Sequence, residues 1–219
     1  MNSRFAAAAL AVQLLSFGAA AEPAKAPLVG DAGAGATKAA VCGACHGPTG
    51  TGNSVNPEWP SLAGQHGGYV VEQLVLLKSG VRVAPVMNPM AATLSPQDMA
   101  DLAAYFEHQT LVGLEADPAL WQAGQKLYRG GDAARAIPAC IGCHGPNGLG
   151  NGPARWPQIR AQQPAYVAAQ LKSYASRSRY VALAGQAPPP ASAEIMSDIA
   201  GRLSDNDVKA LAGYLQGLR

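Results

Sequence analysis

The chain has 219 residues, of which 48% are hydrophobic and only 14% are charged, and its formal net charge is +2. This length suits one large domain or two small ones. The average soluble chain carries about 25% charged residues, so the composition excludes a charge-driven disordered chain. Without a run of lysine and arginine, binding to nucleic acid is excluded as well.

The first 21 residues have the pattern of a secretory signal peptide. Arg4 supplies the positive start, Phe5 to Phe17 form a short apolar run, and small residues end at Ala21. This run is shorter than the roughly 20 residues that span a bilayer. We therefore predict cleavage near Ala21 and a mature protein in the bacterial periplasm; an uncleaved anchor is the alternative, and a loose association with the membrane stays open.

All four cysteines belong to one motif, C-x-x-C-H, which occurs twice and attaches c-type haem. Two thiols one helical turn apart can reach the two vinyl groups of a porphyrin, and the following histidine can bind the iron. A zinc site would leave both histidines unexplained. A thioredoxin-like dithiol would need a βαβ alternation that the sequence does not show, and structural disulfides are a further, less favoured alternative. The motifs predict two haem c groups with their iron, bound by Cys42, Cys45 and His46, and by Cys140, Cys143 and His144.

Four helices are indicated by their ends and by apolar spacing. The first covers residues 69–79 and stops at Gly80; the second covers 95–109, with an S-x-x-D capping box. A third begins at Asp117, with Leu120, Ala123, Gly124, Leu127 and Tyr128 on one face, where Gly124 would let another helix approach closely. The fourth follows Ser204 and repeats the capping box with Asp207. No alternating strand is evident, so the predicted fold is all-α.

The chain is a tandem repeat. Recurring residues lie 97 or 98 positions apart through most of its length, and 109 apart near the end of each half. The difference is a net insertion of 12 residues in the second half, which includes the proline-rich segment 184–193 and is expected to be a loop. We expect an N-terminal domain at 22–112, a linker at 113–118 and a C-terminal domain at 119–219.

The repeat also selects a sixth iron ligand. The first half offers Met87, Met90, Met99, His66 and His108, whereas the second offers only Met196. Met87 pairs with Met196, each seven residues before a Leu-Ser helix start. We therefore predict His46/Met87 and His144/Met196 ligation. Met90 and Met99 are expected in the core, and His66 and His108 are expected on the solvated surface.

Six other large side chains recur between the ligands and are candidate haem contacts: Arg82 and Arg179, Trp59 and Trp156, Tyr69 and Tyr166. A guanidinium group suits a carboxylate, so both arginines are expected to pair with haem propionates.

An exported chain with two such motifs, each followed by a methionine, a Leu-Ser cap and a D-x-x-x-L-A-x-Y helix, resembles the cytochrome c4 family. The resemblance extends from about Gly35 to Arg219. It implies two tandem class I cytochrome c domains, each wrapped around a covalently bound haem. It also implies electron exchange with periplasmic or membrane redox partners, such as a quinol-oxidising complex and a terminal oxidase.

If two protein side chains bind each iron, no coordination position is left for a substrate, which favours an electron carrier over an enzyme. The first alternative is an electron-transfer subunit of a periplasmic dehydrogenase. A haem enzyme, such as a dihaem peroxidase or a thiosulfate-oxidising cytochrome, is less favoured because no catalytic acid and base stand out. The low net charge predicts docking through apolar surface rather than strong electrostatic steering.

Overall fold

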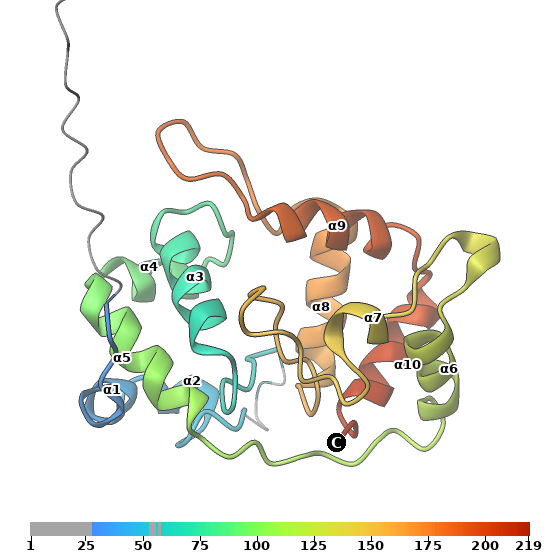
Figure 1. Ribbon diagram of the computed structural model, residues 1–219, viewed down its shortest axis with the longest axis horizontal. Coiled ribbons are helices and arrows are strands. Elements are labelled where there is room, and N and C mark those ends of the chain that lie inside the picture. Colours follow the sequence, from blue (N-terminus) through green and yellow to red (C-terminus); the bar gives the residue numbers. More distant parts are fainter. Residues whose placement is uncertain (1–27, 53–55, 57) are drawn as a thin grey trace, which may run out of the picture.

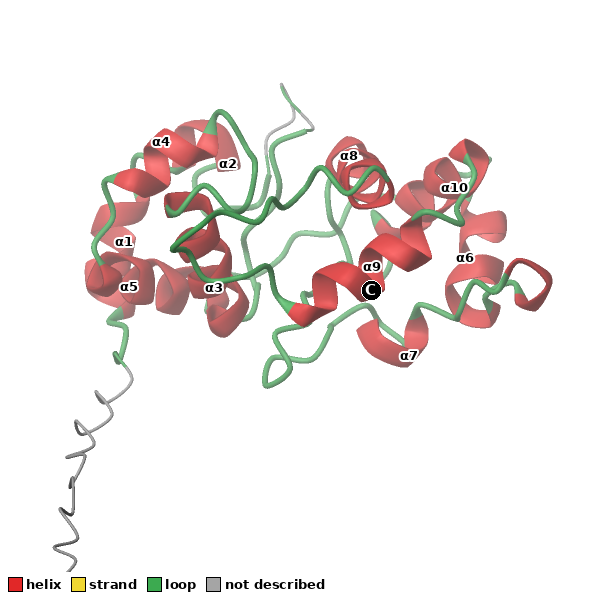
Figure 2. Cartoon of the chain, turned by 90° about the horizontal axis from the view of Figure 1, so that it is seen from above, coloured by secondary structure: helices red, strands yellow, loops and turns green. Residues whose placement is uncertain are grey.

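The computed structural model describes residues 28–52, 56 and 58–219. They form two groups of helices side by side, joined by the extended segment between α5 and α6 (Figure 1). Seen from above in Figure 2, helices α1 to α5 lie on one side and α6 to α10 on the other. Between residues 28 and 219, the described part contains no named strand, which confirms the all-α prediction. The predicted signal peptide, residues 1–21, lies outside the described residues.

In chain order the α-helices are α1 (Ala32–Ala39), α2 (Gly43–His46), α3 (Gly67–Lys78), α4 (Met87–Ala92), α5 (Pro96–Glu107), α6 (Trp121–Gly130), α7 (Ile141–His144), α8 (Pro164–Ala175), α9 (Ala191–Ala200) and α10 (Asp205–Leu215). A short 3-10 helix, η1 (Ala133–Arg135), lies between α6 and α7.

The first group is built on the packing of α1 against α5. The Ser95 hydroxyl accepts a hydrogen bond from the Asp98 amide, and the Asp98 carboxylate accepts one from the Ser95 amide. This capping box, which is typically worth about 1 kcal/mol, confirms the helix predicted from residue 95. Gly35 allows α1 to approach closely, because a Cβ there would overlap the Asp101 carbonyl. The core between the helices contains Ala39, Leu102 and Phe106.

The second group repeats this arrangement with α6 and α10. Ser204 and Asp207 form the same reciprocal capping box, as predicted. Gly124 is buried against α10, where a Cβ would overlap the Ala210 carbonyl oxygen, so the expected close approach is confirmed. Around this contact lies a core of Leu127, Tyr128, Ile137, Val167, Leu211, Tyr214 and Leu215.

The start of α6 was predicted wrongly. It begins at Trp121 rather than Asp117, because the Asp117 carboxylate accepts the Ala119 amide at 2.8 Å and the intervening residues form a turn. Aspartate commonly favours such a local turn over the first turn of a helix. Ala123, expected on the inward face of this helix, is exposed.

The proline-rich insertion is also only partly a loop. Its last residues join α9, which begins at Ala191 directly after Pro190. A proline in front of a helix removes an N–H that needs no intrahelical partner, so the three prolines end the loop without disturbing the helix. The predicted helix at 69–79 is confirmed as α3, and Gly80 follows it with a φ of +79°.

Buried polar side chains join the two halves. The Gln65 amide group donates to the Gln158 carbonyl and accepts from the Gln158 backbone amide, both at 2.9 Å. Gln162 likewise donates to the Ser61 carbonyl at 2.9 Å and accepts from the Ser61 amide at 2.7 Å. Because buried backbone groups require partners, these bonds fix the two halves against each other.

A second junction lies between the segments that follow α3 and α8. The Val83 amide donates to the Arg179 carbonyl at 2.9 Å, and the Val181 amide donates to the Val81 carbonyl at 2.8 Å. The two segments therefore pair as a short antiparallel contact across the boundary.

Candidate haem-binding sites

Each C-x-x-C-H motif forms a one-turn helix. In the first, α2, the His46 amide donates to the Cys42 carbonyl at 2.9 Å; in the second, α7, the His144 amide donates to the Cys140 carbonyl at 2.9 Å. The first cysteine of each motif is thus held one turn before its histidine. This turn would let the two thiols of each motif bind one haem covalently while the histidine binds its iron.

Both motif histidines are buried and oriented alike. The His46 Nδ1 donates to the Pro60 carbonyl at 2.8 Å, and the His144 Nδ1 donates to the Pro157 carbonyl at 3.1 Å. Burial lowers the pKa of both imidazoles. A neutral ring whose Nδ1–H is already engaged presents the Nε2 lone pair to a metal.

The four cysteines form no disulfide with one another. Burial raises the pKa of Cys42, and it raises the pKa of Cys140 to about 11. No cluster of three or more His, Cys, Asp or Glu side chains suited to a metal ion occurs within residues 28–52, 56 and 58–219. The four thiols therefore do not gather into the zinc site considered as an alternative.

The methionines lie in two different settings. Met87 is the first residue of α4, whereas Met196 lies inside α9, which the insertion extends; both are half-buried. Met99 is buried in the core as predicted, but Met90 is 44% exposed and the prediction of a core position for it is wrong. Helix α4 has only six residues and leaves this side chain facing solvent.

The two remaining histidines differ. His108 is exposed at the end of α5, as predicted. His66 lies at the surface but is half-buried there, and its Nε2 donates to the Leu149 carbonyl of the other half at 2.7 Å, a contact that was not expected. It is part of the contact between the halves.

Arg82 and Arg179 also lie at this contact, and each reaches a tyrosine of the opposite half. Arg82 Nη2 donates to the Tyr166 hydroxyl at 3.1 Å, and Arg179 Nη2 donates to the Tyr69 hydroxyl at 3.3 Å. Burial raises the pKa of Tyr69 to about 12. At neutral pH this phenol therefore keeps its proton and can still donate a hydrogen bond.

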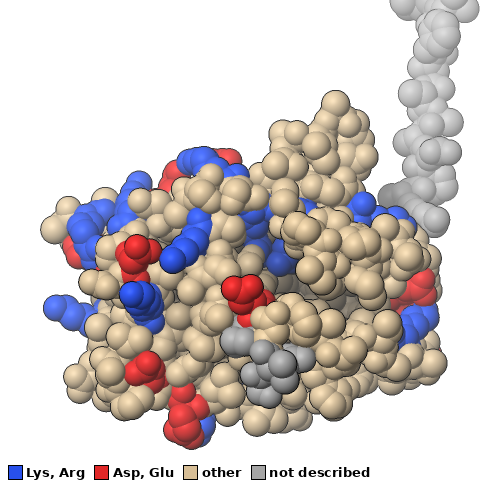
Figure 3. All heavy atoms as spheres, turned by 180° about the vertical axis from the view of Figure 1, so that it is seen from behind, with Lys and Arg blue, Asp and Glu red and all other residues tan. Residues whose placement is uncertain are grey.

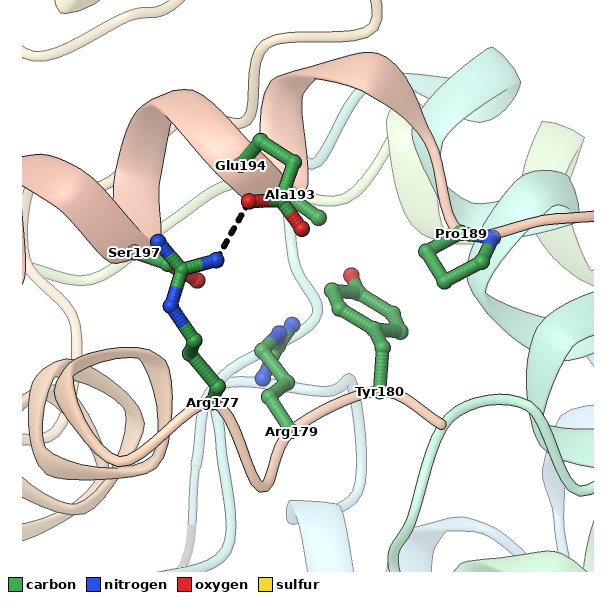
Figure 4. Close-up of a pocket in the computed structure, with 7 residues that line it drawn as sticks. All are labelled: Arg177, Arg179, Tyr180, Pro189, Ala193, Glu194 and Ser197. Atoms are coloured by element: carbon green, nitrogen blue, oxygen red, sulfur yellow. Dashed lines mark hydrogen bonds and ion pairs between the residues drawn. The ribbon is translucent and has the colours of Figure 1, made fainter. Parts of the chain in front are cut away.

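Arg179 is the more enclosed of the two arginines. Its Cζ lies 4.9 Å from the ring centroid of Tyr174 and 5.3 Å from that of Tyr180. Figure 4 shows Arg179 and Tyr180 next to each other, facing Ala193 and Glu194 of α9. These residues line a small cavity of about 50 Å³, which is room for one or two waters. Within the described residues, Arg179 Nε and Nη1 are buried without an acceptor.

Two buried and unpaired guanidinium donors are costly unless an anion meets them. Haem carries two propionate carboxylates, which are suited to a guanidinium fork. The unpaired donors of Arg179, together with the two oriented imidazoles, therefore fit a haem group.

Trp59 and Trp156 each stand one residue before the proline whose carbonyl holds a motif histidine. Both are half-buried. Sequence reasoning missed the glutamines at the boundary, although Gln65 and Gln162 recur 97 residues apart and the repeat could have revealed them. It also missed Gln73, whose side-chain oxygen accepts from Arg82 at 3.1 Å and from Tyr180 at 3.0 Å.

Comparison with known proteins supports this reading of the two halves. The family profile described as Cytochrome c matches residues 31–110 and again 121–219. Cytochrome c4 of Azotobacter vinelandii is 45% identical over 198 residues, which cover 86% of this chain and 90% of that protein. The crystal structure of reduced recombinant cytochrome c4 from Pseudomonas stutzeri matches with a TM-score of 0.78 and 42% identity, over 87% of this chain and 100% of that chain.

A more distant relative is the thiosulfate dehydrogenase electron acceptor of Stutzerimonas stutzeri (strain A1501), which is 35% identical over 82% of this chain and 80% of that protein. Two helical domains, each with one haem-attachment motif, define a dihaem c-type cytochrome. The chain belongs to the cytochrome c4 family. It binds two haem c groups covalently and is an electron carrier that exchanges electrons with other proteins, not an enzyme.

Proposed function

We propose that the chain shuttles electrons in the periplasm between a quinol-oxidising complex and a terminal oxidase. His46 and Met87 would bind one iron, and His144 and Met196 the other. The observation that carries this proposal is the shared setting of the two buried histidines, each donating Nδ1–H to a proline carbonyl. The haem iron, when bound, supplies reversible one-electron exchange.

The thiols of each motif would form the thioethers: Cys42 and Cys45 in the first half, Cys140 and Cys143 in the second. The helical turn between the first cysteine and the histidine supports this assignment. Mass spectrometry of the exported protein should detect two added porphyrins, and replacing one cysteine pair by serine should remove one of them. Retention of both porphyrins in that variant would contradict the assignment.

Arg82 and Arg179 would hold haem propionates, with the Tyr69 and Tyr166 hydroxyls beside them. The unpaired, buried donors of Arg179 support this role most directly. Trp59 and Trp156 would line the haem edges, a placement supported by their position next to the prolines that orient the histidines.

Export would remove residues 1–21, with cleavage near Ala21. The mature chain would then divide into domains at 22–112 and 119–219, with 113–118 as the linker. In the described part of the chain, no helix combines the length and apolar character needed to cross a membrane.

A second candidate function is that of an electron-accepting partner of a periplasmic dehydrogenase. The observation that favours it is the 35% identity to a protein described as a thiosulfate dehydrogenase electron acceptor. The residues that hold the haems would be the same in both roles. Co-purification with a dehydrogenase, and its reduction of this chain at a useful rate, would favour the second candidate.

A redox titration of the purified holoprotein, followed by optical spectroscopy, tests the proposal. Two one-electron transitions are expected, and both oxidised haems should contribute the far-red band of methionine-to-iron charge transfer. A high-spin signal from either haem would indicate an open coordination position and would overturn the assignment of a simple carrier.

A further inference from the structure

Exposed aliphatic side chains gather where the two halves meet beside α4. Five large hydrophobic residues with substantial exposure lie on two short segments, 83–90 and 181–183; we call them the Val83–Leu183 patch: Val83, Val86, Met90, Val181 and Leu183. Scattered exposed hydrophobic residues are normal on a protein surface, but a cluster of them marks an interaction site.

The patch is one surface rather than two. The paired segments set Val83 opposite Arg179 and Val181 opposite Val81, so the two valines lie diagonally across one short pairing. A Cβ added at Gly80 would lie 3.5 Å from the Leu183 side chain. Asn88 fixes α4 to the same place, because its Nδ2 donates to the Arg82 carbonyl at 2.9 Å. In Figure 1 the loop that precedes α9 projects above the segment joining α3 to α4.

This surface carries almost no charge. From residue 81 to 97 Arg82 is the one charged residue, and residues 180–193 contain none. The Arg82 side chain turns inward to Tyr166. At the border, Arg177 forms ion pairs with both Glu194 and Asp198, so this group of three carries one net negative charge. In the view from behind, the projecting loop is free of charged side chains, whereas charges of both signs are spread over the rest of this face (Figure 3).

The patch adjoins the proposed iron ligand of the first half. Val86 directly precedes Met87, and Met90 follows one turn later on α4. A protein seated on the patch would thus contact the helix that carries this ligand. Since short distance favours electron exchange, such a position suits a redox partner.

We propose that the Val83–Leu183 patch is the docking surface for a redox protein whose own contact surface is apolar and uncharged. The patch continues the junction between the halves and has no charge with which to select a lysine-ringed or carboxylate-ringed partner. This inference rests on the proposed function, because it gives that electron exchange a location.

A lipid surface is the other occupant that an apolar patch could contact. Interfacial membrane segments typically combine apolar side chains with lysine, arginine and tryptophan. Residues 83–90 and 181–193 contain none of these three. The composition therefore favours a protein partner.

Two valines with nearly equal exposure, one inside the patch and one outside it, allow a matched comparison of variants. Val86 in the patch is 63% exposed, and Val112, in the segment between α5 and α6, is 62% exposed. The holoprotein variants are Val86→Asp, Leu183→Asp and the control Val112→Asp. The probe is a blue copper protein whose copper edge is ringed by apolar side chains, and stopped-flow absorbance gives the second-order rate of electron exchange.

We expect Val86→Asp and Leu183→Asp each to slow exchange by about tenfold or more, because a carboxylate must be desolvated on docking. Val112→Asp changes the net charge by the same amount but lies outside the patch, so its exchange rate should stay within about twofold of that of the parent. Equal slowing by all three variants, or by none, overturns the proposal.

Two further readouts separate this inference from the proposed function. The first is the far-red band, recorded with both midpoint potentials on the same samples. If the parent protein itself lacks this band, the proposed methionine ligation is wrong. The comparison of exchange rates among the variants still tests the docking surface in that case. Sedimentation with phosphatidylcholine vesicles gives the second readout. If Val86→Asp abolishes vesicle binding and leaves the exchange rate unchanged, the patch contacts lipid and the proposal is wrong.

Discussion

Gln65 and Gln162 hold equivalent places in the two halves, 97 residues apart, and each clamps the backbone of the other half with two hydrogen bonds. Their targets, Gln158 and Ser61, are also 97 residues apart. Arg82 and Arg179 reach Tyr166 and Tyr69 by the same exchange. The internal repeat therefore pairs with itself as the subunits of a two-fold dimer do.

Replacing both clamps, Gln65→Ala together with Gln162→Ala, should loosen the two domains from each other. Each change leaves a buried backbone N–H and C=O unpaired, which costs about 1–3 kcal/mol. Calorimetry should show the unfolding of the parent as one transition and that of the variant as two. Gln122→Ala, at an exposed site on α6, is the control and should unfold as the parent does.

The Arg179→Gln variant should have a lower midpoint potential at one or both haems. A buried guanidinium disfavours the extra positive charge of oxidised iron, so its removal stabilises the oxidised state. We expect a shift on the order of 50 mV, which corresponds to about 1.2 kcal/mol for one electron. Spectroelectrochemical titration measures it.

Arg155→Gln is the matched control for that experiment. Arg155 also crosses between the halves, where its Nη1 lies 3.1 Å from a Glu72 carboxylate oxygen, but its side chain is exposed to solvent. Its charge is screened by water, so both potentials should stay near those of the parent. Equal shifts for the two variants would refute a specific role for Arg179.

Two glycines of α6 should respond oppositely to the same substitution. Gly124→Ala places a methyl group against the Ala210 carbonyl, so we expect a loss of about 2 kcal/mol or more as α10 is pushed away. At Gly130 a Cβ meets nothing within 4 Å, and Gly130→Ala should be neutral or stabilising. The melting temperatures of the two variant holoproteins distinguish them; comparable losses for both would contradict the packing described.

The junction of α1 with α5 should weaken in acid. Asp101 accepts hydrogen bonds from the Asp31 amide and from Lys38 and Gln97, and these lower the pKa of its carboxyl group to about 2. Because this pKa is lower in the folded than in the unfolded state, the ionised carboxylate stabilises the fold at any pH above the pKa of the unfolded state. This stabilisation is lost as the pH falls from about 4 to about 2.

The Asp101→Asn variant should therefore be less stable than the parent at pH 7 and should lose less stability over that acid range. Melting temperatures of the two proteins across the pH series measure the difference. Asp205→Asn, at an exposed position on α10, is the control and should follow the parent. An acid dependence of Asp101→Asn equal to that of the parent would exclude this role for the carboxylate.

Local signals in the sequence predicted most of the fold. The capping boxes at Ser95 and Ser204 and the apolar spacing that follows them are determined by neighbours within a few residues. The close approach at Gly124 was predictable because one helix face contained a residue without a side chain.

Contacts between the halves could not be predicted in this way. The hydrogen bond from His66 to Leu149 joins residues 83 positions apart and leaves no periodic pattern near either one. The exposure of Met90 likewise depends on how a short helix is fixed by Asn88, not on the spacing of its apolar residues. For the arginines, the repeat identified the positions but gave no sign that each reaches into the opposite half.

The most direct test is the far-red absorption of the oxidised holoprotein in the parent, in Met87→Ala and in Met196→Ala. If a thioether binds each iron, each single variant should lose about half of the band, and the double variant should lose all of it, while mass spectrometry still finds two porphyrins. An unchanged band in either single variant would contradict the account.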